Sequence, residues 1–150
     1  MDYRNSLSDQ NLIIYGHHFA RDYDPEGNRQ FAPLDLLLSQ ENYEDNRYLK
    51  LILDSEIRSY EVSSVFVISV LDDYAVQIIR TDMNRDFSGN ADPDFFKGYI
   101  KYMNTVSEYE TGVLLSEDDR ILTLVTCLQH QPEQRQIVIC KEIGIKMYDN

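Results

Sequence analysis

The chain has 150 residues, of which 26 are acidic and 14 are basic, so its formal charge is -12. Leu, Ile, Val and Phe make up 43 of these residues, which is enough to build a core and excludes a disordered chain. A single domain covering residues 1–150 is therefore expected. The basic side chains are scattered, and a net negative field repels phosphate, so nucleic acid and anionic membrane surfaces are poor partners. A peptide-like or cationic partner is favoured.

The first predicted element is a short strand that ends at two histidines. Residues 12–15 form an apolar, partly β-branched run that Gly16 stops, which is typical of a buried strand. His17 and His18 follow directly. Residues 20–30 are charged and contain turn-forming Pro, Gly and Asn, so they predict a surface loop.

Two segments predict helices. In residues 31–39 apolar side chains recur at spacings of three and four, and Pro33 is acceptable in a first helical turn. Residues 92–106 begin with Asp92 and Pro93, which suit the cap and first position of a helix, and they carry an apolar stripe. We expect this longer helix to pack on a sheet.

The remaining apolar segments predict strands. Alternating or β-branched patterns occur at residues 48–53, 57–71, 76–80, 121–126 and 135–140, and the segment 57–71 predicts one or two strands. The last two segments should form an antiparallel pair, joined by a loop at residues 128–134. Strands outnumber helices, so the predicted fold class is mostly β, a barrel or folded sheet with two helical insertions.

Three residue types with complementary chemistry lie at predicted strand ends. Cys127 follows the strand at 121–126, and a thiol there becomes a nucleophilic thiolate when a base or a cation is near. Arg135 opens the next strand, so pairing places it opposite Cys127, where a guanidinium can stabilise a thiolate or an oxyanion. An imidazole must exchange the proton, and His17 and His18 are the candidates. Neighbouring strand residues point to opposite faces, so we expect one histidine at the site and the other in a loop or on the surface.

These residues also resemble a known family. The stretches Asn-Leu-Ile-Ile-Tyr-Gly-His at residues 11–17 and Thr-Leu-Val-Thr-Cys at residues 123–127 are similar, in order and context, to those of the sortases. Arg135 follows eight residues after the cysteine, as the family pattern requires. The motif Ile-Tyr-Gly-His and a long helix before the cysteine strand, here residues 92–106, are typical of class B. The resemblance covers nearly the whole chain.

The resemblance implies a cysteine transpeptidase. In it Cys127 is the nucleophile, His17 the acid and base, Arg135 the stabiliser of the substrate backbone and oxyanion, and Thr126 a substrate-binding residue. Sortases cut the sorting motif of a surface protein after its Thr, hold the protein as a thioacyl enzyme, and pass it to an amine of a peptidoglycan precursor or of another protein. The class requires no metal and no cofactor. The implied fold is a closed β-barrel, and the implied location is the extracellular face of the membrane of Gram-positive bacteria.

The chain departs from the family pattern at two points. Class B enzymes commonly carry Asn after Gly-His, where this chain has His18, so both imidazoles stay candidates. The family also has a membrane anchor, N-terminal helices and a first strand ahead of the position of Met1, so we expect the N-terminal part of the barrel to be missing. An open barrel edge exposes unpaired backbone groups, and we expect it to promote self-association or to lower activity.

Two other functional classes use the same residues. A cysteine peptidase or hydrolase would employ the same three side chains with water as the acceptor, and a sortase-like binding module would have lost turnover. The second thiol, Cys140, lies five residues beyond Arg135, too far along the strand to bridge a cysteine opposite that arginine. We therefore expect Cys140 to be structural and reduced.

The sequence supports a calcium or a zinc site less well than the cysteine site. The acidic residues within 22–26 mimic the start of a calcium loop, but its twelfth position is Pro33 rather than a bidentate Glu. A zinc site built from Cys127 and His130 with His17 lacks the usual second pair of ligands. A solvated turn is the favoured interpretation of the acidic segment.

Overall fold

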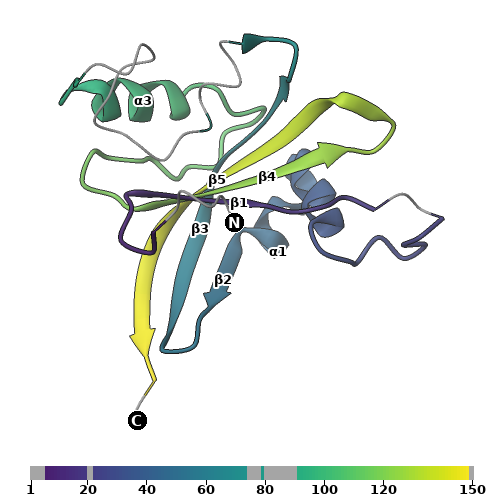
Figure 1. The fold of residues 1–150 in the computed structure, drawn as a ribbon, viewed down its shortest axis with the longest axis horizontal. Coiled ribbons are helices and arrows are strands. Elements are labelled where there is room, and N and C mark those ends of the chain that lie inside the picture. The colour runs from purple at the N-terminus through teal and green to yellow at the C-terminus, as the bar shows by residue number, and fades with distance from the viewer. Residues whose placement is uncertain (1–5, 20–21, 74–78, 80–90, 149–150) are drawn as a thin grey trace.

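The computed structural model describes residues 6–19, 22–73, 79 and 91–148, and one sheet dominates them (Figure 1). Its strands are β1 (Asn11–Tyr15), β2 (Tyr48–Ile52), β3 (Glu56–Ser69), β4 (Ile121–Leu128) and β5 (Gln131–Met147). The helical elements are the 3-10 helices η1 (Ala32–Leu38) and η2 (Gln40–Asn42) and the α-helices α1 (Tyr43–Asn46) and α3 (Phe95–Met103). The mostly β fold class is confirmed. The strand predicted at residues 76–80 lies outside the described residues, apart from Ile79.

The strands lie in the order β1-β4-β5-β3-β2, with β1 parallel to β4 and the other neighbouring pairs antiparallel. Within the described ranges β1 and β2 form the two edges, so the sheet is open and does not close into the barrel that the resemblance implied. The predicted pairing of the last two strands is confirmed, since Cys127 lies opposite Arg135. The parallel pair matters for the site because parallel strands end at the same edge of a sheet.

The connection between β4 and β5 is shorter than predicted. The expected loop at residues 128–134 is wrong, because β4 continues to Leu128 and β5 begins at Gln131 after a two-residue turn. Pro132 is therefore one of the first residues of a strand, a position that tolerates proline. The register shifts just after Cys127, and a bulge takes up the extra residues of β5. Because of this bulge, Cys127 lies opposite Arg135 as predicted, although the turn is shorter than the predicted loop.

The two faces of the sheet carry separate cores. The core beneath α3 includes Ile13, Phe66, Phe96, Tyr99, Val125 and Ile137. The core on the other face, beneath η1 and α1, includes Leu12, Leu34, Tyr43, Val65, Leu124 and Val138. Successive strand residues point to opposite faces, so Leu12 and Ile13 enter different cores. The central strands are thus buried on both sides, which accounts for their nearly continuous apolar sequences.

Both predicted helical insertions are present in shorter form. The segment predicted at residues 31–39 is a 3-10 helix, and its buried side chains are Ala32, Leu34 and Leu37. The longer helix begins at Phe95 rather than at Asp92, because Oδ1 of Asp92 accepts the N–H of Asp94 (3.0 Å) in a turn that precedes the helix. Its buried stripe is Phe96, Tyr99, Ile100 and Met103. As predicted, this helix packs on the sheet.

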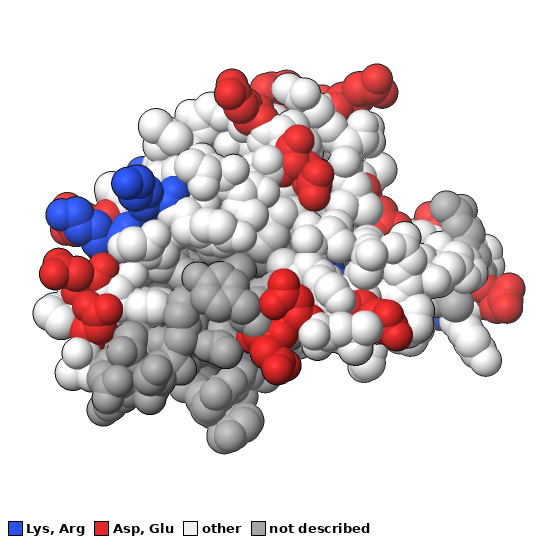
Figure 2. Space-filling view, turned by 90° about the horizontal axis from the view of Figure 1, so that it is seen from above, with Lys and Arg blue, Asp and Glu red and all other residues white. Residues whose placement is uncertain are grey.

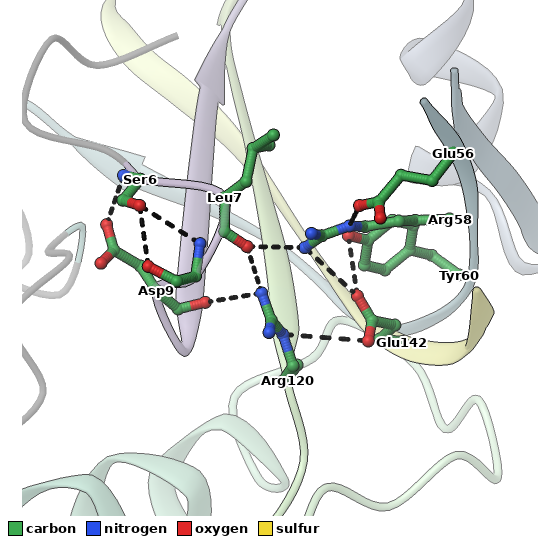
Figure 3. Close-up of polar contacts among 9 residues, drawn as sticks. Ser6, Leu7, Asp9, Glu56, Arg58, Tyr60, Arg120 and Glu142 are labelled. Carbon is green, nitrogen blue, oxygen red and sulfur yellow. Dashed lines mark hydrogen bonds and ion pairs between the residues drawn. The ribbon is translucent and has the colours of Figure 1, made fainter. Parts of the chain in front are cut away.

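A network of arginines and carboxylates closes the end of the sheet at which β1 and β4 begin (Figure 3). Arg58 pairs with Glu56 and Glu142, and its Nη1 donates to the carbonyl of Leu7 (2.8 Å). Arg120 donates to the same carbonyl, and its Nε lies 3.8 Å from Glu142. The side chains of Arg58 and Glu142 are only 8% and 11% exposed. The network holds the segment that leads into β1 against the sheet.

The surface reflects the acidic composition. Figure 2 shows acidic side chains spread over the upper face, with basic side chains gathered near one margin beside acidic ones. With a formal charge of -12, such a surface attracts cations and basic peptides more than phosphates. In the described part of the chain, no helix has the length and apolar character that crossing a membrane requires.

Candidate active site

The carboxyl ends of β1 and β4 meet at one pocket. Tyr15 lies opposite Val125 in the parallel pair, so the residues that follow, His17 and Cys127, arrive at the same edge of the sheet. The pocket has a volume of about 220 Å³, and its lining is Tyr15, Gly16, His17, Gln30, Val125, Thr126, Cys127 and Arg135. The four site residues predicted from the sequence are thus brought together in one place.

Cys127 is the penultimate residue of β4, and its side chain is partly exposed. It lies directly opposite Arg135, so the two side chains share the face of the sheet that α3 covers further along. Nη1 of Arg135 donates to the carbonyls of Pro132 and Gln134, each at 2.8 Å. These bonds hold the guanidinium in the pocket wall. Among the described residues nothing engages its Nε and Nη2, so these donors are available to a ligand.

His17 stands beyond the end of β1, where the backbone is held on both sides. Its N–H donates to Oε1 of Gln30 (3.2 Å), and its carbonyl accepts the N–H of Phe31 (3.2 Å). Gln30 has a φ of 48°, a left-handed conformation that is uncommon for residues other than glycine and often occurs at functional sites. We predicted only a surface loop at Gln30, because no local pattern marks a residue whose function is to hold another backbone.

Gly16 and Thr126 join β1 to β4 where the pocket begins. The N–H of Gly16 donates to the carbonyl of Val125 (3.0 Å), and its own carbonyl accepts the hydroxyl of Thr126 (2.9 Å). Thr126 is 2% exposed and points to the face opposite Cys127. A Cβ at position 16 would fall within the ring of Phe31, so only glycine fits there. Thr126 therefore shapes the pocket wall, and its role in substrate binding stays a prediction.

His18 lies in the loop after β1, as expected of one of the two histidines, but its side chain is buried and contacts β4. Its side chain is 4% exposed, its Nδ1 lies 3.0 Å from the carbonyl oxygen of Cys127, and its Nε2 lies 3.3 Å from Oδ2 of Asp35. Because β1 ends at Tyr15, the alternation of strand faces does not extend to residues 17 and 18, and it does not direct His18 away from the site. Both histidines lie beside the end of β4, and His17 is the one that lines the pocket.

Cys140 differs from Cys127 in its burial and in the face of the sheet to which it belongs. It is fully buried within β5, in the core beneath η1. It pairs with Leu122, five residues before Cys127, so the two thiols belong to opposite faces of the sheet. Burial raises the pKa of the Cys140 thiol, which keeps it protonated. Both cysteines are free, as predicted for a structural and reduced Cys140.

The described residues contain no group of three or more His, Cys, Asp and Glu side chains that could hold a metal ion. In the acidic segment, Asp24 is 2% exposed and its carboxylate accepts the backbone N–H of Arg29 (2.9 Å). It orders a turn, as expected for that segment, but Asp24 itself is buried rather than solvated. His130 is exposed in the turn between β4 and β5.

A larger cavity of about 710 Å³ lies between β3 and residues 104–114. The hydroxyl of Ser63 donates to the carbonyl of Val113 (2.8 Å), and the hydroxyl of Thr111 donates to the carbonyl of Ser63 (2.7 Å). The described lining holds no Cys, His, Lys or Arg. These hydrogen bonds attach residues 104–114 to the edge of β3 that β2 does not cover. We therefore attribute the cavity to the packing of this loop and take the smaller pocket as the candidate site.

No family model matches the chain. Its sequence is similar to that of Sortase B of Listeria monocytogenes, with 29% identity over 128 residues, which are 84% of this chain and 45% of the Listeria protein. The chain therefore spans less than half the length of this relative.

Solved structures provide a second comparison. The fold is similar to that of Clostridium perfringens sortase B, with a TM-score of 0.75 and 26% identity over 94% of this chain and 70% of the other. It is also similar to Staphylococcus aureus sortase B in a complex with substrate, with a TM-score of 0.74 and 26% identity over 95% of this chain and 60% of the other. Both comparisons cover almost all of this chain. In sequence and in fold, the chain is similar to the class B sortases.

Proposed function

We propose that the chain acts as a sortase-type cysteine transpeptidase on the sorting motif of surface proteins. The observation that carries this proposal is the convergence of Cys127, Arg135 and His17 on one pocket at the shared end of β1 and β4. They supply a nucleophile, an anion-binding guanidinium and a proton carrier, which are the groups that acyl transfer requires. The similarity to class B sortases supports the assignment.

In the first step, the thiolate of Cys127 attacks the carbonyl carbon of the Thr that precedes the scissile bond. Nε and Nη2 of Arg135 donate to the oxygen on which negative charge develops. The tetrahedral intermediate then collapses, the C–N bond breaks, and the imidazolium of His17 gives its proton to the departing amine. The products of this step are a thioester on Cys127 and the released C-terminal fragment.

In the second step, an acceptor amine attacks the thioester. The amine gives a proton to His17, a new amide bond forms, and Cys127 leaves as the thiolate. Staphylococcus aureus sortase B has been solved with substrate, and a sortase B has been solved with triglycine. For this chain, those complexes support a peptide donor and an amine acceptor, and we assign the acceptor to a peptidoglycan precursor or a protein lysine. Water in place of the amine would make the protein a hydrolase.

Three further assignments belong to the same proposal. The chain works at the extracellular face of the membrane, and Thr126 forms part of the wall that the substrate contacts. Beyond Glu142, among the described residues, no strand pairs with the edge of β5 that faces β4, and Ile143, Ile145 and Met147 are exposed there. Self-association would use this edge. Sedimentation of wild-type protein and of Ile145→Lys, which adds a charge to the edge, tests this assignment.

Turnover of a panel of fluorogenic peptides with Thr before the scissile bond, with and without added triglycine, tests the proposed reaction. The wild-type protein should release the C-terminal fragment and, with triglycine present, form the amide product. Cys127→Ala and His17→Ala should abolish both products. Cys140→Ala removes the other thiol and is the matched control that should keep them.

The outcome also separates the alternative functions. Hydrolysis that triglycine does not divert to an amide would identify a cysteine hydrolase. Alkylation of Cys127 without turnover of any peptide would identify a binding module. Retained turnover in Cys127→Ala would end the assignment of this residue as the nucleophile.

A further inference from the structure

The side chain of His18 extends the row of hydrogen bonds between β1 and β4 beyond the end of β1. In the last regular bond, the N–H of Gly16 donates to the carbonyl of Val125 (3.0 Å). The next carbonyl on the same edge of β4 is two residues on, at Cys127, because strand carbonyls alternate between the two edges. β1 has ended by this point, and Nδ1 of His18 lies 3.0 Å from the Cys127 carbonyl oxygen.

We propose that His18 is a positioning residue that fixes the backbone of Cys127, a role that rests on the proposed function of Cys127 as the nucleophile. Regular pairing with β5 is also interrupted here, since the register shifts between Cys127 and Leu128. The peptide that joins these two residues therefore relies on the imidazole for a fixed orientation. The backbone at Cys127 in turn sets the direction in which the thiol leaves the strand.

The surroundings of His18 support this role. Its side chain is 4% exposed and is held at both ring nitrogens, by the Cys127 carbonyl and by Oδ2 of Asp35. Both partners accept hydrogen bonds, so the imidazolium can donate to the two at once, whereas the neutral ring can donate to only one. Asp35 belongs to η1, which is tied to β5 because Nε2 of Gln136 donates to the carbonyl of Leu34 (2.7 Å). The imidazole of His18 is thus held between β4 and η1, and η1 is itself bonded to β5.

This arrangement separates the roles of the two histidines. With both nitrogens engaged, His18 has none left to exchange a proton with the thiol of Cys127. Its contact is with the carbonyl, which lies in the plane of the sheet and points towards β1, whereas the thiol projects from the face. His17, which lines the pocket, is free to take the proton-transfer role.

Three substitutions of His18 isolate the bond to the carbonyl. His18→Asn keeps an N–H donor attached to Cγ, at the position of Nδ1, and loses the reach to Asp35. His18→Gln carries the same amide one bond further out, so it can reach towards Asp35 and not the carbonyl. His18→Leu removes both donors. His130→Asn is the matched control, because it exchanges an exposed histidine of the adjacent turn whose φ of 62° suits asparagine.

We expect His18→Leu and His18→Gln to lower kcat by between about tenfold and a hundredfold, because small displacements of a reacting group cost this much, with KM changed by less than about threefold. His18→Asn should stay within about threefold of wild type, as should His130→Asn. The amide resonance of Leu128, which shares a peptide plane with the Cys127 carbonyl, should shift in the Leu and Gln variants and stay near its wild-type position in the Asn variant. Asn and Gln carry the same group and no charge, so their difference reports on geometry alone.

Equal loss in the Asn and Gln variants, or wild-type kcat in His18→Leu, would overturn the inference. Melting temperatures identify any variant that fails to fold, and the Asn–Gln comparison is then made on the folded pair. Failure of the proposed function has a different signature, in which wild-type protein turns over no peptide of the panel. In that case the rate of Cys127 alkylation by iodoacetamide and the Leu128 resonance still decide whether His18 positions the cysteine.

Discussion

The arginines at the two ends of β4 have different partners. Where the strand begins, Arg58 and Arg120 pair with Glu142, and both donate to the carbonyl of Leu7 (Figure 3). Where it ends, about 23 Å away at about 3.3 Å per residue, Arg135 bonds only to carbonyls of its own strand within the described structure. At the start of β4 the arginine charges are neutralised by carboxylates. At its end, Nε and Nη2 of Arg135 have no hydrogen-bond partner among the described residues.

This difference shows how to distinguish a structural arginine from a binding arginine. A buried arginine among carboxylates has its charge neutralised within the fold, and removing it leaves carboxylates buried without a partner. A half-buried arginine without a carboxylate keeps its charge for an anion that comes from outside, and such groups gather at functional sites. Burial by itself does not separate the two, because both kinds are partly or fully covered.

The largest expected effect is the loss of activity on substitution of Arg135. Arg135→Ala should lower kcat/KM by about 10²- to 10³-fold, the usual result of removing a donor to a developing oxyanion. Arg135→Lys should stay poor, because a point charge does not reproduce the planar fork. The melting temperature should change little, since no carboxylate is left unpaired. Full activity in the Lys variant would mean that charge alone suffices at this end.

The opposite result is expected at the other end of β4. Arg58→Ala should lower the free energy of unfolding by about 3 kcal/mol, because it leaves buried carboxylates without their partner. Peptide turnover per folded molecule should be unchanged. Urea denaturation gives the stability, and Lys97→Ala, an exposed cation on α3, is the control with an expected change below about 0.5 kcal/mol. A change in turnover with intact folding would show that the two ends are coupled.

A third test uses two glycines. Gly16→Ala should destabilise the protein by about 1 to 3 kcal/mol and lower turnover, because the new Cβ falls within the ring of Phe31 at the pocket edge. Gly98→Ala is the matched control, since its Cβ would meet no atom and it lies within α3. Alanine is the better helix former, so this control should stabilise the protein by up to about 1 kcal/mol. Equal effects of both substitutions would contradict the close approach at Gly16.

The smallest effect concerns alkaline pH at the arginine-rich end. Burial, and then the charge of Glu142, raise the pKa of Tyr60 to about 12. The unfolded chain has an ordinary Tyr pKa of about 10, so the contribution of Tyr60 to stability is complete below pH 10 and is lost as the pH rises towards 12. Tyr60→Phe should therefore lose less stability over this window than wild type, by the order of 1 kcal/mol. Parallel pH profiles would show that Tyr60 ionises as it does in the unfolded chain.

Local sequence patterns predict much of the sheet. Strand alternation located β2, β3, β4 and the middle of β5, because half-buried and fully buried strands leave a clear apolar signature. The opposition of Cys127 and Arg135 was also predictable, since it follows from a hairpin between neighbouring strands. The prediction of a loop at residues 128–134 was wrong, because proline is typical of loops and Pro132 lies instead near the start of β5.

The parts that were missed depend on distant contacts. Nothing within residues 11–18 indicates that β1 runs parallel to β4, which is more than a hundred residues away. The role of His18 depends on Asp35 and on a carbonyl of β4, so no local spacing reveals it. Gln30 holds the backbone of His17 from a segment whose composition predicts only a turn. The family resemblance located the side chains that we propose to react, and the structure adds the residues that contact them.

The parallel pairing of β1 with β4 has a consequence for the folding order. Tyr15 and Val125 are neighbours in space and 110 positions apart in the chain, so bringing them together closes a long loop and carries a large entropic cost. The hairpin of β2 and β3 closes a loop of only a few residues, and local pairings of this kind form early. A chain that has folded only its local hairpins has neither the pocket nor the bond from His18 to the carbonyl of Cys127. Thiol chemistry is therefore expected to arise together with the last long-range contacts, so that a partly folded chain holds Cys127 as an ordinary cysteine.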